Sequence, residues 1–210
     1  MSYSLIHGPT RRSDAPYMFE LPHSEFIDAL GPGDHAKLGF EYDSPDREFG
    51  GERMWVLIDE VDGDRFSGTL DNMPAEDVLS CGDRVEFSRD HILDFRYAEG
   101  KARPFVSPRP DYFRRCMVDA CVLYDGVPVE YLYREEPDLG QPDDEHADSG
   151  WRIRGRQGDA TDEDMEDREA AYVALGAVLN RDDSWLHLID APTGSAFTRH
   201  FRTGEYQDVS

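Results

Sequence analysis

A proline-rich, locally basic segment divides this sequence into two short halves. Pro104, Pro108 and Pro110 interrupt the pattern of helices and strands, because proline has no backbone N–H to donate to either. Basic residues outnumber acidic ones in the same stretch, with Lys101, Arg103, Arg109, Arg114 and Arg115 against Glu99 and Asp111. We interpret residues 97–115 as a linker that packs along an acidic surface, between units at residues 1–96 and 116–210.

Each half is large enough to form a small packed unit. The chain has 210 residues, of which 39% are apolar and 11% aromatic, and folded domains of roughly 100 residues are common. Short strand patterns separated by tight turns favour small antiparallel sheets that curl. The predicted fold class is therefore α+β, with two small units, each a curled antiparallel sheet with short helices.

In the first half, alternation and turn signals predict most of the sheet. Residues 35–42 alternate in polarity, which places Ala36, Leu38, Phe40 and Tyr42 on one face. Asp62-Gly63 predicts a tight hairpin, because glycine tolerates the positive φ of such turns. The other expected elements are a helix at 25–30 capped by Ser24, strands at 53–60, 65–70 and 84–87, and short helices at 74–82 and 88–95.

The second half gives similar signals. Asp125-Gly126 indicates a hairpin between strands at 116–124 and 127–134, and an acidic loop follows at 135–149. Thr161 and Asp162 can cap a helix through Asn180. Four residues of that helix fall near one face: Met165, Tyr172, Leu175 and Leu179. Further strands are expected at 151–154, 185–190 and 197–201.

The charge of the chain limits its partners. There are 22 Lys and Arg residues against 45 Asp and Glu, a net charge of −23, which repels phosphate backbones and anionic membrane surfaces. We therefore expect no nucleic acid and no membrane as partner. No apolar run is long enough for a signal peptide or a membrane helix, and three cysteines cannot all pair within one chain. We expect a cytoplasmic protein.

No motif indicates catalysis, a cofactor or a metal. Ser195 lacks the flanking glycines of a nucleophile elbow, and neither phosphate-binding glycine motif is present. Cys116 and Cys121 should lie on opposite faces of a strand, so they do not converge on one ion. Four carboxylates in the acidic loop could gather a hard cation or form a solvated loop, and we claim no metal site there: Asp143, Asp144, Glu145 and Asp148.

Trp55 is ambiguous because its neighbours in the strand occupy the opposite face. Met54, Val56 and Ile58 share one side of residues 53–60, and Trp55 lies on the other. Tryptophan most often packs in cores, but its indole also serves in contacts. Either both faces of the strand are covered or Trp55 is exposed as a contact residue.

Two family resemblances cover most of the chain. Residues 51–56, 63–74 and 82–87, with Gly33-Asp34 before the first long strand, resemble the YegJ-like bacterial domain of unknown function over residues 32–95. Residues 126–129, 133–137, 148–152 and 192–199 resemble a bacterial domain of unknown function that is grouped with immunity proteins of polymorphic toxin systems. Neither resemblance brings a catalytic residue, so together they imply a binding role.

Two functional hypotheses follow. The first is a non-enzymatic binding protein of immunity-protein type that recognises a basic, toxin-like protein. Its recognition surface would consist of Asp148, Trp151 and Arg152 with the turn at 192–199, which holds Ser195 and Arg199; a buried Arg152–Asp148 pair is the structural alternative. The second is a small-ligand-binding or hydrolytic domain with a pocket between the two units, lined by Glu52, Arg53 and Trp55.

Overall fold

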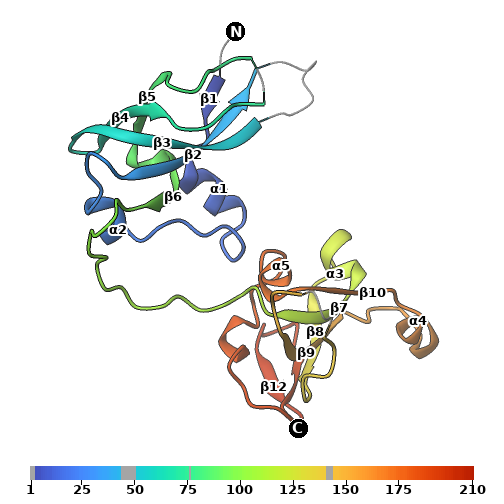
Figure 1. The fold of residues 1–210 in the computed structure, drawn as a ribbon. Helices are drawn as coiled ribbons and strands as arrows, with labels where there is room; N and C mark the ends of the chain where they lie inside the picture. The colour runs from blue at the N-terminus through green and yellow to red at the C-terminus, as the bar shows by residue number, and fades with distance from the viewer. Residues whose placement is uncertain (1–2, 44–50, 76, 141–143) are drawn as a thin grey trace. The chain divides into compact units, whose positions relative to one another are not determined.

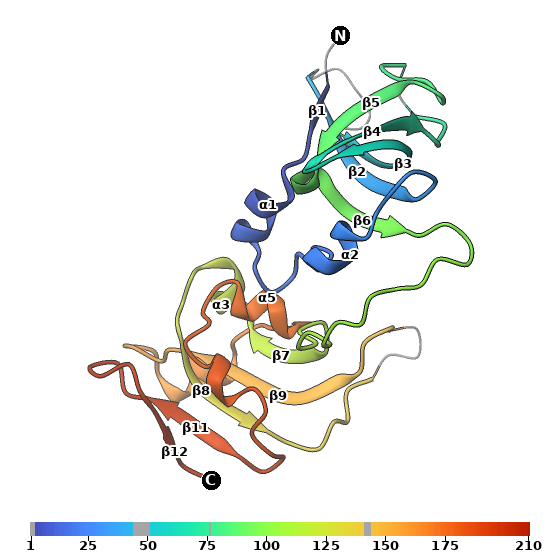
Figure 2. The ribbon, with the colours of Figure 1, turned by 90° about the vertical axis from the view of Figure 1, so that its left-hand side faces the viewer.

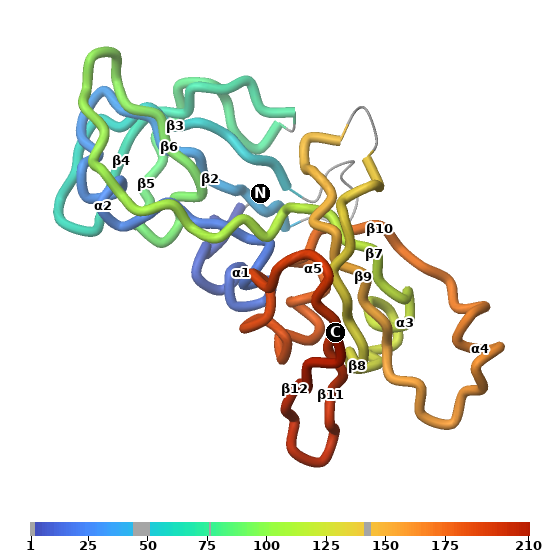
Figure 3. The backbone as a smooth tube through the Cα atoms, turned by 90° about the horizontal axis from the view of Figure 1, so that it is seen from below, coloured from blue at the N-terminus to red at the C-terminus, as the bar shows by residue number. Residues whose placement is uncertain are grey.

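The chain, in a computed structural model that describes residues 3–43, 51–75, 77–140 and 144–210, forms two compact units. The first unit comprises residues 1–15 and 19–109, and the second comprises residues 16–18 and 110–210. Figures 1 and 3 colour the first unit from blue to green and the second from green to red. Each unit contains its own six-stranded sheet and its own hydrophobic core.

The sheet of the first unit is antiparallel throughout and is centred on β2 (His35–Tyr42). β3 pairs along one edge of β2, while β1 and β6 share the other edge, at residues 40–42 and 35–38 respectively. β4 and β5 extend the sheet beyond β3. The remaining elements are β1 (Tyr3–Leu5), α1 (Gly8–Asp14), α2 (Ser24–Asp28), β3 (Gly51–Asp62), β4 (Arg65–Leu70), β5 (Arg84–Ser88), the 3₁₀ turn η1 (Arg89–His91) and β6 (Ile92–Arg96).

The predicted pattern of β2 is confirmed, and it explains how this core forms. Ala36, Leu38 and Phe40 are fully buried, and Met54, Val56 and Ile58 of β3 line the same interior. The hairpin is also confirmed: Asp62 pairs with Arg65 across a turn in which Gly63 has φ +58°. The opposite face of β3 carries Trp55.

The sheet of the second unit is mixed. Its strand order is β10-β7-β9-β8-β11-β12, and β7 and β9 run parallel while every other neighbouring pair is antiparallel. The fold class is α+β as predicted, with this parallel pair as a departure. The elements are β7 (Arg115–Asp119), α3 (Ala120–Tyr124), β8 (Val129–Arg134), β9 (Asp148–Gly155), α4 (Asp162–Glu166), β10 (Ala170–Ala174), α5 (Leu175–Leu179), η2 (Leu186–Leu188), β11 (Ala196–Arg199) and β12 (Tyr206–Asp208).

Helices cover one face of this second sheet. Figure 2 shows α3 and α5 on the same side of β7 and β9, and the core between them contains Cys116, Val118, Leu132 and Ile153 of the strands. Because side chains alternate along a strand, Tyr131 and Tyr133 of β8 lie on the opposite face from Leu132. The segment that carries α4 extends away from the sheet, as Figure 3 shows.

Two helix predictions in the first unit were wrong. Residues 74–75 and 77–82 form no helix but bends, turns and irregular structure, in which Ala75 N–H donates to the Glu52 carboxylate and Ser80 N–H donates to Asp83 Oδ2. Ser88 begins only the single turn η1, after which β6 pairs with β2. The predicted helix near residues 25–30 is present as α2, although His23 rather than Ser24 occupies its N-cap.

The second unit departs further from expectation. The predicted strand at 116–124 ends at Asp119 and continues as α3, so Gly126 follows a helix rather than closing a hairpin. The predicted helix at 162–180 contains α4, β10 and α5, and the predicted strand at 185–190 is the 3₁₀ turn η2. β1, α1 and β12 were not predicted. The longest helix in the described part of the chain, α1, has seven residues, too few to cross a bilayer.

Candidate functional site

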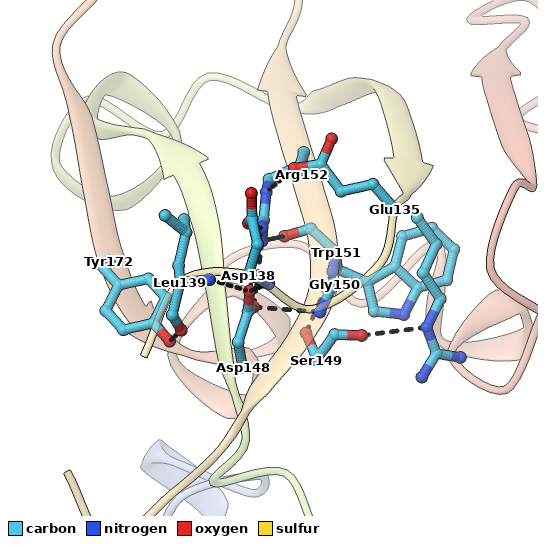
Figure 4. A network of polar contacts seen from close by, with 10 residues as sticks. Glu135, Asp138, Leu139, Asp148, Ser149, Gly150, Trp151, Arg152 and Tyr172 are labelled. Atoms are coloured by element: carbon cyan, nitrogen blue, oxygen red, sulfur yellow. Dashed lines mark hydrogen bonds and ion pairs between the residues drawn. The ribbon is translucent and has the colours of Figure 1, made fainter. Parts of the chain in front are cut away.

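Arg152 lies at the centre of a group of carboxylates at one end of β9. Its Nη1 and Nη2 donate to Oδ1 and Oδ2 of Asp148 at 3.0 and 2.9 Å, its Nε donates to Glu135 at 2.5 Å, and Nη2 also donates to Asp138 at 2.9 Å. We call these four residues the Arg152 cluster, and Figure 4 shows them. A guanidinium has a planar fork of donors, so it can hold several carboxylates at once.

A bulge in β9 brings Asp148 and Arg152 together. Residues four apart in a flat strand are separated by roughly 13 Å. Here Asp148 is opposite Arg115 of β7 and Arg152 is opposite Met117. Four residues of β9 therefore span the length of two residues of β7, which is the bulge. Gly150 allows this with φ +81°, and a Cβ at that position would collide with the carbonyl oxygen of Glu135.

The cluster is buried at its centre and exposed at its edge. The side chains of Arg152 and Asp148 are 7% and 3% exposed, whereas those of Glu135 and Asp138 are 44% and 71% exposed. An unpaired charge would be costly at a buried position, but here every polar atom of the Arg152 and Asp148 side chains has a hydrogen-bond partner. The arrangement therefore holds two exposed carboxylates in fixed positions over a buried cation.

Asp148 also orders the backbone that follows β8. Its Oδ2 accepts hydrogen bonds from the N–H groups of Asp138 and Leu139, and its Oδ1 accepts one from Gly150 N–H. Burial by itself raises the pKa of Asp148, but the hydrogen bonds from Arg152 and the backbone outweigh it and hold that pKa below its usual value. Hydrogen bonding to Asp148 in turn raises the pKa of Arg152. Both residues are charged at neutral pH.

Trp151 belongs to the core. It is fully buried, its ring lies 5.9 Å from that of Trp185 and 6.4 Å from that of Phe197, and its Nε1 donates to the carbonyl oxygen of Ile189 at 3.1 Å. The indole donor is therefore satisfied inside the unit. Trp151 therefore anchors β9 to the core on the face opposite the Arg152 side chain.

Arg134, which sequence analysis did not select, links the cluster to the turn at 192–199. Its side chain donates to the carbonyl oxygens of Ser149 and Ala191 at 3.0 and 2.6 Å. Its backbone N–H donates to Ser195 O, and its carbonyl accepts from Gly194 N–H. The two halves of the predicted recognition surface therefore meet at one residue.

The side chains of the turn itself have separate roles. Ser195 is half-buried, and its backbone N–H donates to the carbonyl oxygen of Pro192, which closes the turn. Arg199 forms an ion pair with Asp182 at 3.0 Å and lies over the rings of Phe201 and Tyr206. Its guanidinium is thus engaged in packing β11.

Trp55 and Arg53 belong to the first unit. Trp55 is half-buried on the outer face of β3, where Lys37 Nζ and Arg96 Cζ lie 4.9 and 4.7 Å from its ring centroid, and Arg53 is exposed on the same face. Glu52, the third residue of the predicted pocket, accepts hydrogen bonds from Tyr42 Oη and Ala75 N–H. It therefore stabilises the local fold.

No metal cluster is found among the described residues. In that part of the chain no group of three or more His, Cys, Asp or Glu side chains is placed so that it could hold a metal ion, and the three carboxylates around Arg152 bind its guanidinium. Asp144, one of the four carboxylates considered for a cation, instead forms an ion pair with Arg115 at 2.8 Å, and Asp143 lies outside the described residues. Cys116 is buried in β7 and Cys121 lies in α3, so these thiols belong to different elements.

Comparison with protein families agrees with both resemblances. Residues 116–210 match the model of the Immunity protein Imm33 domain, and residues 30–105 match that of an uncharacterised protein family conserved in bacteria, DUF2314. Comparisons with curated proteins and with solved structures found no match. The Arg152 cluster, β8 and the turn at 192–199 all lie within the segment that matches the immunity domain.

Proposed function

We propose that this chain is a non-enzymatic binding protein of immunity type, whose second unit recognises a basic, toxin-like protein. The match of residues 116–210 to an immunity-protein domain carries this proposal. A net charge of −23 favours association with a basic partner and raises the rate of encounter. Inhibition by occlusion needs a complementary surface and no catalytic residue.

We assign the contact surface of the second unit to the outer face of β8. Tyr131 and Tyr133 lie there with ring centroids 5.6 Å apart, and Tyr131 is 36% exposed. We call this pair the tyrosine ledge. Tyrosine is enriched at binding hot spots because it offers a large, rigid apolar area and a hydroxyl group.

Acidic groups border the tyrosine ledge. Glu135 follows Tyr133 by two residues and Asp138 lies three residues further on, and Arg152, which pairs with Tyr133 across β8 and β9, holds both carboxylates. Because Arg152 holds them before binding, these two carboxylates would lose little further conformational entropy when a basic partner binds. Glu135 and Asp138 therefore supply charge complementarity beside an aromatic centre.

This proposal gives the residues predicted from the sequence a positioning role. Asp148 and Arg152 fix the two exposed carboxylates, Trp151 anchors β9 to the core, and the turn with Ser195 and Arg199 borders β8. Contact with the partner is assigned to the tyrosine ledge and to Glu135 and Asp138.

The test begins with an affinity pull-down from the native cell lysate, with this chain as bait, to recover the basic toxin that it is proposed to bind. Calorimetric titration of an inactive variant of that toxin measures the affinity. Replacing both Tyr131 and Tyr133 by Ala should weaken binding by roughly 100-fold, the scale of an interface hot spot. Tyr124, which is 76% exposed at the end of α3, provides the matched control, and Tyr124→Ala should bind normally.

Stoichiometry tests the non-enzymatic character. Toxin activity should fall in proportion to added protein and vanish near one equivalent. Complete inactivation by a small fraction of an equivalent would show turnover and contradict the proposal. Equal loss of affinity in the Tyr124→Ala control would reject the tyrosine ledge as the contact surface.

A further inference from the structure

The first unit contains a cationic and aromatic group that the proposed function does not use. On the outer face of its sheet, Lys37 of β2 is directly opposite Trp55 of β3, Arg53 is two residues from Trp55, and Arg96 of β6 is opposite His35. Residues two apart in a strand share a face, so these side chains lie on one surface. We call Lys37, Arg53, Trp55 and Arg96 the Trp55 patch.

The indole of Trp55 lies on the outer face of the sheet with its two cationic neighbours, outside the core. Lys37 Nζ and Arg96 Cζ lie within 5 Å of the ring centroid, a distance at which a cation is attracted to the π face. A cation–π contact uses no N–H group as a hydrogen-bond donor. The N–H groups of Lys37 and Arg96 therefore stay available to bind an anion.

These cations have no acidic partner within the described part of the chain. Nine Lys and Arg residues there form ion pairs, but Lys37, Arg53 and Arg96 are not among them. Asp94, opposite Lys37 in the sheet, accepts a hydrogen bond from Phe95 N–H instead. The patch thus remains locally positive in a strongly acidic protein.

We propose that the Trp55 patch is a docking site for a short acidic segment of a partner protein. Tryptophan and arginine are among the residues most enriched at protein hot spots, and two or three carboxylates would match the three cations that have no ion pair within the described residues. Charges this close act within the Debye length of about 8 Å, so the local field overrides the distant negative charge.

Single-stranded nucleic acid is a poorer match for this surface. Its binding sites combine a continuous basic groove with several aromatic side chains on which successive bases stack. The Trp55 patch has one indole, and Asp94 lies next to it, opposite Lys37, so the surface offers neither a continuous basic groove nor a second stacking position. A long polyanion would also meet the repulsion of the whole chain, with 45 acidic residues against 22 basic ones.

Fluorescence of the full-length chain can test the site. Trp151 and Trp185 are fully buried in the second unit, so a ligand at the first unit changes the emission of Trp55. The probe is an end-capped synthetic peptide of glutamate and leucine, which contains no aromatic residue. We expect a saturable change at low salt that Trp55→Phe abolishes, and roughly tenfold weaker binding in the Lys37→Gln, Arg96→Gln double variant.

A charge-matched control makes the result decisive. Arg12 and Arg65 lie in the same unit, also lack ion pairs within the described chain, and are absent from the patch. The Arg12→Gln, Arg65→Gln variant should bind the peptide normally. The proposal is overturned if this control weakens binding equally, if an oligothymidylate binds more tightly than the peptide, or if no saturable change occurs. None of these outcomes bears on toxin binding by the second unit.

Discussion

Asp148 and Arg152 form a two-pronged ion pair within a single strand, although four residues separate them in sequence. The pair exists because β9 bulges at Gly150, which shortens the path between the two side chains. A local feature of one strand therefore places a buried cation where Glu135 and Asp138 can reach it. The shape of the proposed recognition surface depends on this pair.

Removal of Arg152 should destabilise the second unit strongly. Arg152→Met leaves Asp148 buried without its counter-ion, which typically costs about 3–5 kcal/mol. Urea unfolding followed by tryptophan fluorescence in a Trp55→Phe background measures this loss of unfolding free energy. The remaining tryptophans, Trp151 and Trp185, both report on the second unit. Arg181→Met, at an exposed position, should change stability by less than about 0.5 kcal/mol.

A double-mutant cycle separates structure from recognition. Asp148→Leu combined with Arg152→Met should recover much of the stability lost in either single variant, since no buried charge remains unpaired. Toxin affinity should nevertheless stay low in the double variant, because Glu135 and Asp138 are no longer held. Normal affinity in a stable double variant would remove the cluster from the recognition surface.

Gly150 should tolerate no side chain. Gly150→Ala adds a methyl group against the Glu135 carbonyl at φ +81°, so its cost should exceed the roughly 1 kcal/mol expected for a left-handed residue alone. Gly204 has φ +80° with open space around it and gives the matched control. Thermal unfolding should show a clearly larger loss for Gly150→Ala than for Gly204→Ala; equal losses would contradict the steric account.

The contribution of Asp148 to stability should disappear in acid. Its folded pKa lies below the ordinary value of 3.8, so ionised Asp148 stabilises the unit at neutral pH and this stabilisation is lost as pH falls through the folded pKa. The difference in unfolding free energy between wild type and Asp148→Asn should therefore be constant at neutral pH and shrink below about pH 4. A difference that does not change with pH would contradict the ionised pair.

The three thiols should react at different rates. Cys81 is exposed, burial raises the pKa of Cys121, and complete burial raises that of Cys116 much further. Because the thiolate is the reactive form, maleimide should label Cys81 first, Cys121 slowly and Cys116 only after unfolding. Peptide mass mapping over time checks this order, and early labelling of Cys116 would show that β7 opens in the native protein.

Local sequence signals predicted elements whose structure is decided locally. The alternation of residues 35–42 and the glycine at position 63 each specify a conformation by themselves, and both predictions are confirmed. The predicted helix at 162–180 shows the limit of such signals. Thr161 does cap α4, but residues 170–174 pair with β7 instead of continuing the helix, since edge pairing in the sheet outweighs helix propensity.

The site was only partly predictable for the same reason. Asp148, Trp151 and Arg152 were selected because they share a motif, yet the sequence did not reveal that Trp151 faces the core. Glu135 and Asp138 reach Arg152 from 17 and 14 residues away. That contact depends on the positive φ of Gly150, and a glycine in a sequence does not disclose which conformation it adopts.

The position of β9 has a consequence for synthesis of the chain on the ribosome. β7 and β8 follow each other in sequence, but β9 lies between them in the sheet and emerges only after residue 148. Until then the inner edges of β7 and β8 have no strand to pair with, and exposed edges invite association with other chains. The first unit can complete its sheet during this time, while the inner edges of β7 and β8 remain unpaired. The nascent second unit is therefore most prone to aggregation just before β9 is synthesised.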